Sequence, residues 1–300
     1  MVSQRVTDIA VASYAKWHTP EWDLALMRSG YDEMLPDPID GAMVAEDTLD
    51  GVPGLWVRVA ESEPADVTFY LHGGGSFIGS ARGYSGLASR IARSSRSSVM
   101  VLDFSLAPEA TLIDQYDETV RAYRALISRD DVDPARVCLV GDSGGGGLAL
   151  SLLLALRDAG DPLPACVAMM SPRVDLTMSG DTWDTLDGHD PMITRAAGEQ
   201  AIEMTIGSIA RDDVRVSPLF GDLAGLPPLL VQVGSAEVLL SDSIRLAEKA
   251  RRAGVSVELQ VAYEMMHVYQ TFCDELPEAE SSIEDLGSFL RAHVPTTTMR

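Results

Sequence analysis

Lysine is almost absent from this 300-residue chain, in which only Lys16 and Lys249 occur. Lysine and arginine together number 23 against 45 aspartate and glutamate residues, so the formal net charge is −22. A chain with so little positive charge lacks the electrostatic footprint for binding nucleic acid or an anionic membrane surface. We therefore expect no nucleic-acid partner and no membrane partner, and we interpret the excess of carboxylates as a solvated acidic shell.

Cysteine and long apolar runs are also scarce. The cysteines, Cys138, Cys166 and Cys273, are odd in number and widely separated, which argues against a disulfide framework or a cysteine-based metal site. The longest apolar segment, around residues 148–156, is far too short to span a bilayer. Asp8 and Lys16 interrupt the N-terminal stretch, so no signal-peptide pattern is visible. The sequence thus predicts a cytoplasmic protein.

Short β-prone runs are what the chain does contain, and from residue 55 onward they alternate with helical patterns. Several runs are continuously apolar, as strands covered on both faces of a parallel sheet must be. The expected strands are residues 55–60, 67–71, 99–104, 137–140, 166–170, 229–233 and 255–261. The expected helices are residues 86–94, 115–128, 148–159, 241–253 and 283–293. This alternation predicts an α/β fold with a mostly parallel central sheet flanked by helices.

Two segments interrupt the alternation. Residues 1–50 carry helical patterns but no clear strand, and residues 176–215 are polar and turn-rich before a helical stretch near 196–209. Neither segment extends the predicted sheet, so we expect them to form an N-terminal and a second cap segment over one end of it. Residues 51–175 and 216–300 would then form the main α/β domain.

A serine lies between glycines directly after the expected strand 137–140. Residues 141–145 read Gly-Asp-Ser-Gly-Gly, which fits the G-x-S-x-G turn that presents a nucleophilic serine between a strand and a helix. The turn strains the backbone and leaves no room for neighbouring side chains, which Gly141 and Gly145 lack. A five-residue pattern is weak by itself, so the partners of Ser143 decide its meaning.

A glycine triplet follows the expected strand 67–71, where residues 72–75 read His-Gly-Gly-Gly. Consecutive glycines allow backbone amides to approach the anionic oxygen of a tetrahedral intermediate, as in an oxyanion hole. A flexible turn is the commoner explanation of such a triplet on its own. Its combination with the serine turn downstream favours the oxyanion hole.

An acid and a histidine complete the pattern. Glu237 follows the buried strand 229–233, and His267 follows the last expected strand. Asp242 is the competing acid, but it lies in the first turn of an expected helix, with Ser241 as the N-cap, and suits a capping role better. Serine, acid and histidine follow one another in the order typical of α/β-hydrolases.

Phosphate and dinucleotide binding fit the glycines less well. The spacing Gly144-x-Gly146-x-x-Ala149 matches a dinucleotide fingerprint, but it follows about the fourth strand, and no acidic residue closes the next one. No Lys-Ser or Lys-Thr follows the glycines, as a phosphate loop requires. The acyl-transfer interpretation is therefore preferred.

Over residues 55–293 the chain resembles the hormone-sensitive-lipase-like α/β-hydrolases, also called bacterial family IV carboxylesterases. The matching motifs are residues 72–75, 103–109 (Asp-Phe-Ser-Leu-Ala-Pro-Glu), 141–145, 171–177 (Ser-Pro-Arg-Val-Asp-Leu-Thr), 190–191 (Asp-Pro), 217–219 (Ser-Pro-Leu) and 226–228 (Leu-Pro-Pro). The chain departs from the family in having Gly144 for the usual alanine and Glu237 for the commoner aspartate. Residues 110–113 also lack the usual His-Pro-Phe-Pro.

The resemblance implies a serine carboxylesterase with Ser143 as nucleophile, His267 as base and Glu237 as acid. It implies oxyanion-hole amides from Gly73, Gly74 and Gly144, needs no metal or other cofactor, and suggests homodimerisation through an edge strand such as 255–261. We also expect the substrate to be contacted by His72, Asp142, Trp17, Trp22 and Met27.

The expected substrate class follows from the apolar side chains of the N-terminal segment. Aromatic and methionine residues within 1–34 predict an adaptable apolar pocket, and with no strongly apolar lid segment we expect short- to medium-chain esters. Two alternatives stay open: an amide or other acyl hydrolase with the same groups, and a non-catalytic small-molecule receptor on this scaffold.

Overall fold

The computed structural model describes residues 3–18 and 22–295. Its centre is one eight-stranded sheet in the order β1-β2-β4-β3-β5-β6-β7-β8. Neighbours from β4 to β8 pair in parallel, whereas β1, β2 and β4 pair antiparallel. The strands are β1 (Met43–Leu49), β2 (Val52–Arg58), β3 (Glu63–Leu71), β4 (Ser97–Leu102), β5 (Val137–Asp142), β6 (Val167–Met170), β7 (Leu229–Gly234) and β8 (Val257–Ala262).

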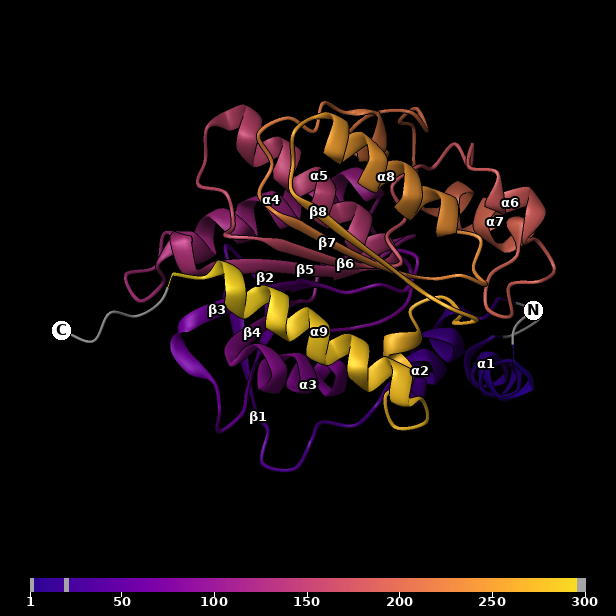
Figure 1. Cartoon of the computed structure of the whole chain (residues 1–300), viewed down its shortest axis with the longest axis horizontal. Coiled ribbons are helices and arrows are strands. Elements are labelled where there is room, and N and C mark those ends of the chain that lie inside the picture. Colours follow the sequence, from indigo (N-terminus) through magenta and orange to yellow (C-terminus); the bar gives the residue numbers. More distant parts are fainter. Residues whose placement is uncertain (1–2, 19–21, 296–300) are drawn as a thin grey trace.

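Helices cover both faces of the sheet (Figure 1). In chain order they are α1 (Gln4–Trp17), α2 (Leu24–Met34), α3 (Ser85–Ser95), α4 (Leu112–Ile127), α5 (Ser143–Ala159), α6 (Thr182–Thr185), α7 (Arg195–Thr205), α8 (Leu240–Arg252) and α9 (Pro277–His293). Helices α3 and α9 pack together on one face, and α4, α5 and α8 lie on the other (Figure 1). Each face therefore has its own apolar core, which is the reason that the parallel strands are apolar throughout.

The central strands and flanking helices confirm the predicted fold class. The edge of the sheet differs from the prediction. The expectation that residues 1–50 contain no strand is wrong. Strand β1 pairs with β2 along the sheet edge, but most of its residues are exposed and it carries no apolar run that would reveal a strand. Ser241 is likewise not an N-cap: α8 begins at Leu240, one residue earlier, and Leu239 occupies the cap position without a side-chain hydrogen bond.

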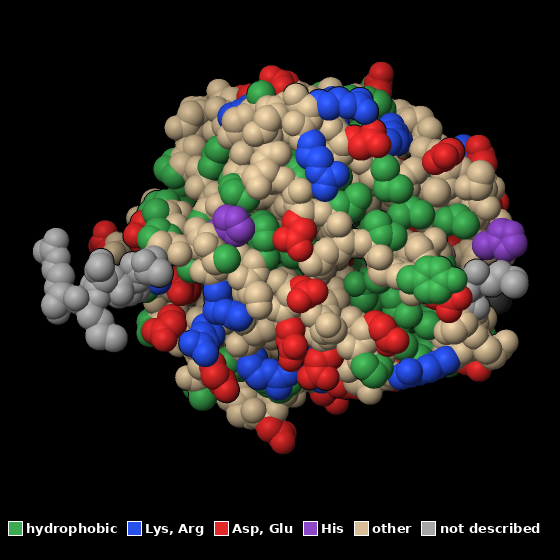
Figure 2. Space-filling model, in the orientation of Figure 1, with side chains coloured by type: hydrophobic (Ala, Val, Ile, Leu, Met, Phe, Trp, Pro, Cys, Tyr) green, Lys and Arg blue, Asp and Glu red, His purple; other side chains and the backbone are tan. Residues whose placement is uncertain are grey.

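On the face shown in Figure 2, acidic and basic side chains are interspersed rather than gathered by sign. Within the described residues, no helix is both long and apolar enough to cross a membrane. Cys138, Cys166 and Cys273 are free thiols; Cys138 lies buried on β5, and Cys166 lies buried directly before β6.

Candidate active site

Ser143 occupies the sharp turn between β5 and α5. Its φ of 51° lies in the left-handed region, which is costly for a residue with a side chain. The turn closes only because its flanks lack side chains: a Cβ on Gly145 would lie 2.1 Å from the carbonyl oxygen of Leu71, and one on Gly141 would lie 2.5 Å from that of Gly145. The glycines thus allow the strained turn that the sequence predicted.

The structure brings Ser143, His267 and Glu237 together at the carboxyl ends of β5, β7 and β8. The Ser143 Oγ lies 2.9 Å from His267 Nε2, and His267 Nδ1 lies 2.6 Å from Glu237 Oε2. Glu237 is fully buried, while Ser143 and His267 are each 8% exposed. A serine hydroxyl, an imidazole and a carboxylate are therefore in hydrogen-bond contact, an arrangement able to activate a serine as a nucleophile, and the serine faces a pocket.

The environment of His267 favours its protonated form. Burial lowers the pKa of the imidazole, but the charge and hydrogen bond of Glu237 outweigh burial, with a further contribution from Asp190, so the net pKa is raised. Asp190 is itself buried, which raises its pKa to about 6 against backbone hydrogen bonds from Val238 and Met192. Because Asp190 accepts from Val238 at 2.8 Å, it ties the 190–193 segment to the loop that carries Glu237.

Ser171 supports the triad from the end of β6, and the sequence analysis assigned it no role. Its hydroxyl donates to Glu237 Oε1 at 2.7 Å and accepts from the amide of Val268, next to His267, at 3.1 Å. The amide of Gly234 also donates to Glu237 Oε1, at 2.6 Å. The carboxylate is therefore fixed by two donors besides the histidine. Ser171 is part of the Ser-Pro motif, which was the only signal for it in the sequence.

The structure corrects the expectation that Asp142 and His72 contact the substrate, because neither residue lines the pocket. Asp142 is fully buried and accepts hydrogen bonds from Tyr70, Tyr84 and the Gly73 amide at 2.8–3.0 Å. His72 is 1% exposed, stacks on Phe104 at 4.4 Å between ring centroids, and has its Nδ1 2.8 Å from the Gly73 carbonyl oxygen. Both residues contact Gly73, the first glycine of the triplet, and lie outside the pocket lining.

The expectation that Gly73 donates to the oxyanion also needs correction. The Gly73 amide is occupied by Asp142 and is not free to bind an oxyanion. The next two glycines line the pocket beside Ser143, and neither amide has a hydrogen-bond partner among the described residues. Gly144 is the second residue of α5, where helix amides have no intrahelical partner. The available donors are thus Gly74, Gly75 and Gly144.

The pocket above Ser143 has a cavity volume of about 120 Å³ and opens to solvent. Its wall is mostly apolar and comes from both segments that were expected to form a cap; the residues from these segments are Tyr14, His18, Trp22, Tyr31, Met34, Trp183, Met192, Ile193, Ala197, Gly198, Ala201 and Ile202. Trp22 stacks on Phe77 at 5.8 Å. Met27 does not line the pocket, because it is fully buried beneath Phe77 and Ile78. The Trp17 side chain lies outside the described part of the chain.

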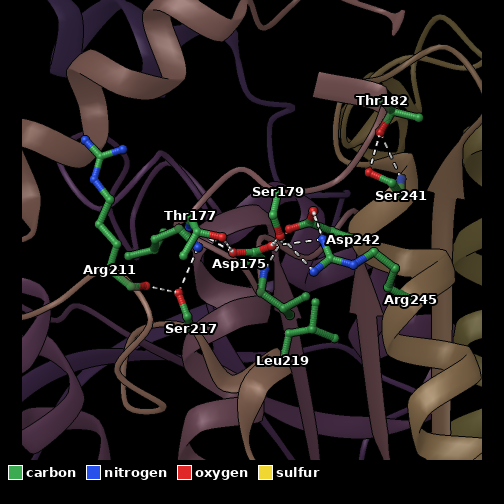
Figure 3. Close-up of polar contacts among 12 residues, drawn as sticks. Asp175, Thr177, Ser179, Thr182, Arg211, Ser217, Leu219, Ser241, Asp242 and Arg245 are labelled. Carbon is green, nitrogen blue, oxygen red and sulfur yellow. Dashed lines mark hydrogen bonds and ion pairs between the residues drawn. The ribbon is translucent and has the colours of Figure 1, made fainter. Parts of the chain in front are cut away.

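Asp242, the competing acid, belongs to a separate buried cluster (Figure 3). It accepts from the Val174 amide at 3.2 Å and lies 3.9 Å from Arg245, which pairs with Asp175 at 2.9 Å. Burial, followed by repulsion from Asp175, raises the Asp242 pKa to about 7. Asp242 therefore braces the loop after β6 and is not bonded to His267. In the described chain, no group of three or more His, Cys, Asp or Glu side chains has an arrangement suited to a metal ion.

Comparison with known proteins agrees with this geometry. Residues 68–271 match a family model described as an alpha/beta hydrolase fold. The chain is 35% identical to an acetyl-hydrolase of Streptomyces hygroscopicus over 92% of both proteins. It is 36% identical to an esterase of Acinetobacter venetianus over 80% of this chain and 79% of that one. A crystal structure of an esterase from the bacterial hormone-sensitive lipase family superposes with a TM-score of 0.93 at 36% identity, covering 98% of this chain and all of the other.

Proposed function

Because the chain belongs to the bacterial hormone-sensitive lipase family of α/β-hydrolases and is a carboxylic ester hydrolase, we propose that it cleaves short- to medium-chain esters through an acyl-enzyme on Ser143. The observation that carries the proposal is the hydrogen-bonded series of Ser143, His267 and Glu237. A buried series with these three roles is the arrangement that activates a serine hydroxyl.

In the first half of the reaction, His267 Nε2 takes the hydroxyl proton while Ser143 Oγ attacks the ester carbonyl. Glu237 holds the imidazole in the tautomer with Nε2 free and stabilises the cation that forms. The protonated histidine then gives its proton to the leaving alcohol. Water, deprotonated by the same nitrogen, attacks the acyl-enzyme and releases the acid with Ser143 restored.

The negative charge that develops on the carbonyl oxygen needs donors already in place. We assign these to the amides of Gly74, Gly75 and Gly144. Each such donor typically lowers the barrier by about 3 kcal/mol because it is preorganised and shielded from water. Asp142 acts here as a positioning residue, since its bond to the Gly73 amide fixes the start of the triplet.

The two cap segments are proposed to set the chain-length preference. Their aromatic, methionine and isoleucine side chains supply apolar surface to the pocket, and such surface favours alkyl groups over polar ones. A bounded pocket of this size suits short and medium acyl or alcohol groups better than long triglyceride chains.

The decisive test is Ser143→Ala, assayed beside the wild type on p-nitrophenyl esters of graded acyl length. We expect the variant to fall to the rate of buffer alone and the wild type to be fastest on short to medium chains. Labelling of wild-type protein by a fluorophosphonate, detected by mass and absent in Ser143→Ala, would show that Ser143 reacts. Retained ester hydrolysis in pure Ser143→Ala protein would refute the assignment.

Homodimerisation through β8 is a separate proposal. This strand lies at the sheet edge, and Val261 and the following Tyr263 are 46% and 78% exposed. Edge strands present unpaired backbone groups that a second copy can pair with. Light scattering of the wild type and of a Val261→Lys variant tests the idea, and a wild-type monomer at micromolar concentration would contradict it.

A further inference from the structure

Arg173 places a cationic group in the wall of the pocket. It is the second residue after Ser171 in the loop that follows β6, and its amide donates to the Ser143 carbonyl oxygen at 2.9 Å. Among the described residues that line the pocket, only Arg173 carries a side chain that is ionised at every physiological pH. A permanent charge next to the nucleophile is unexpected in a wall that is otherwise apolar.

The guanidinium is buried with few partners. Arg173 is 9% exposed, its Nε has no hydrogen-bond partner among the described residues, and its Nη2 donates to Ser76 Oγ only at the long distance of 3.5 Å. No carboxylate of the described chain forms an ion pair with it within 4.0 Å. A buried arginine normally has its planar donors matched by a carboxylate or by carbonyl groups.

The neighbouring charged groups do not explain why the charge of Arg173 is buried. Asp242 is the carboxylate whose field reaches it, but Asp242 accepts from Val174 and shares Arg245 with Asp175. Burial, opposed by Asp242, lowers the Arg173 pKa to about 10, so the side chain is still protonated at neutral pH. The charge is thus retained at a cost in desolvation that no ion pair in the described chain offsets.

The guanidinium lies on the oxyanion side of the nucleophile. A Cβ built on Gly144 would lie 3.4 Å from Ser76 Oγ and 3.5 Å from Arg173 Nη2, so the glycine leaves a methyl-sized gap beside them. Arg173 also lines a smaller adjoining pocket with Ser76, Gly144 and Gln115. The leaving alcohol must instead lie beside His267 Nε2, which protonates it. The acyl portion is therefore the part of the ester nearer to Arg173.

We propose that Arg173 is a specificity-determining residue that binds a carboxylate on the acyl chain, so that half-esters of short dicarboxylic acids are preferred substrates. The unmatched Nε–H and the Nη donors form the planar fork that suits a carboxylate, and Arg173 lines the same pocket as Ser143, beside the gap at Gly144. This inference rests on the proposed esterase function and specifies its substrate class.

The test compares three ethyl esters of similar size: monoethyl succinate, its neutral isostere ethyl succinamate, and ethyl butyrate. The measured quantity is the ratio of kcat/KM for monoethyl succinate to that for ethyl succinamate, from ethanol release. Assays use about 0.15 M salt, where the Debye length is about 8 Å, so that the net charge of −22 repels the anionic ester less. Half-esters of malonate and glutarate then define the preferred chain length.

We expect a ratio of about 10 or more in the wild type, because a charge-assisted hydrogen bond is typically worth a tenfold to hundredfold effect. Arg173→Met should reduce the ratio to about 1 or below, and Arg173→Lys should give an intermediate value because the charge remains without the fork. Arg211→Met is the matched control. It removes one positive charge from a residue that is paired with Glu199 and lines neither pocket, so it should leave the ratio unchanged.

Two outcomes would overturn the proposal. One is a wild-type ratio near 1, and the other is an Arg173→Met variant that loses activity on all three esters equally, as a purely structural residue would. A preference for 3-acetoxypropanoate, whose carboxylate lies on the alcohol side, over monoethyl succinate would also refute the acyl-side assignment. Failure of the esterase function is recognised separately, because ethyl butyrate would then not be hydrolysed in a Ser143-dependent way.

Discussion

The centre of the active site and the wall of its pocket are built on different physical principles. At the centre, backbone atoms approach so closely that only glycine fits, as at Gly145, and the proposed acid Glu237 is wholly buried. The wall comes from segments outside the sheet and is lined by flexible and aromatic side chains such as Met192 and Trp22, the latter half-buried.

The contacts that attach the pocket wall to the rest of the protein illustrate the difference between wall and centre. Helix α2 is held by Arg28, which donates to the Phe77 and Ala107 carbonyl oxygens at 2.9 and 2.8 Å and pairs with the exposed Glu109. Such contacts can rearrange at modest cost, whereas a backbone clash cannot be relieved by a rotamer change. Changes at the centre should therefore abolish chemistry or folding, and changes in the wall should alter which ester is preferred.

The largest effect is expected at the acid. Glu237→Gln should lower kcat by about 10³–10⁴-fold, because the imidazole loses both its orientation and the stabilisation of its cation. Asp242→Asn, the matched substitution of the neighbouring buried acid, should lower kcat much less, since Asp242 does not contact His267. Steady-state kinetics of both purified variants decide the matter, and a greater loss in Asp242→Asn would show that the acid is misassigned.

The pH profile sharpens the same comparison. His267 must be neutral to accept the serine proton, and Glu237 raises its pKa, so kcat/KM should increase as pH rises through that elevated value. In Glu237→Gln the charge is gone, and the acidic limb of the residual activity should move to lower pH. An acidic limb that stays in place would mean that the titrating group is not this histidine.

The next largest effect is expected at the glycines of the turn that carries Ser143. Gly145→Ala places a methyl group 2.1 Å from the Leu71 carbonyl oxygen and should reduce the free energy of unfolding by about 3 kcal/mol or more. Gly144→Ala meets only ordinary van der Waals contacts and should keep the wild-type stability, or gain up to about 1 kcal/mol from helix propensity. Denaturant unfolding measures both, and equal losses would contradict the backbone-contact argument.

A smaller effect, on the pH dependence of the free energy of unfolding, is expected at the buried Asp242. With a folded pKa of about 7 against about 4 when unfolded, Asp242 binds more protons in the native state, so its contribution to stability is full below pH 4 and lost as pH rises to 7. Asp242→Asn should therefore reduce the drop in unfolding free energy between pH 5 and 8, by about 2 kcal/mol. Thermal or urea unfolding at both pH values checks the sign.

The smallest effect is expected in the wall. Trp22→Ala should reduce the preference for butyrate over acetate esters by about threefold to tenfold, because each buried CH₂ contributes about 0.8 kcal/mol and part of that surface would be lost. The free energy of unfolding should change little, since Trp22 is half-buried. A large loss of stability with unchanged selectivity would mean that Trp22 belongs to the core.

The contrast between centre and wall also explains what the sequence could predict. Apolar strands and glycine-flanked motifs have local signatures, so the central strands and the grouping of Ser143, Glu237 and His267 followed from spacing and chain order. The exposed strand β1 has no apolar signature, and it was missed. Which amide of the triplet faces the pocket depends on Asp142 occupying Gly73, a contact between segments 69 residues apart that no local pattern encodes.

Gly144 is the one glycine after Ser143 at which the turn between β5 and α5 can accept a small side chain. A Cβ on Gly145, Gly146 or Gly147 would lie only 2.1–2.9 Å from its nearest neighbour, whereas a Cβ at 144 would make ordinary van der Waals contact with Ser76 and Arg173 at 3.4–3.5 Å. We therefore expect small side chains at this position to be accommodated and to fill part of the proposed acyl subsite. Among the four consecutive glycines, this is the place where the specificity of the enzyme can be redesigned without rebuilding its nucleophile.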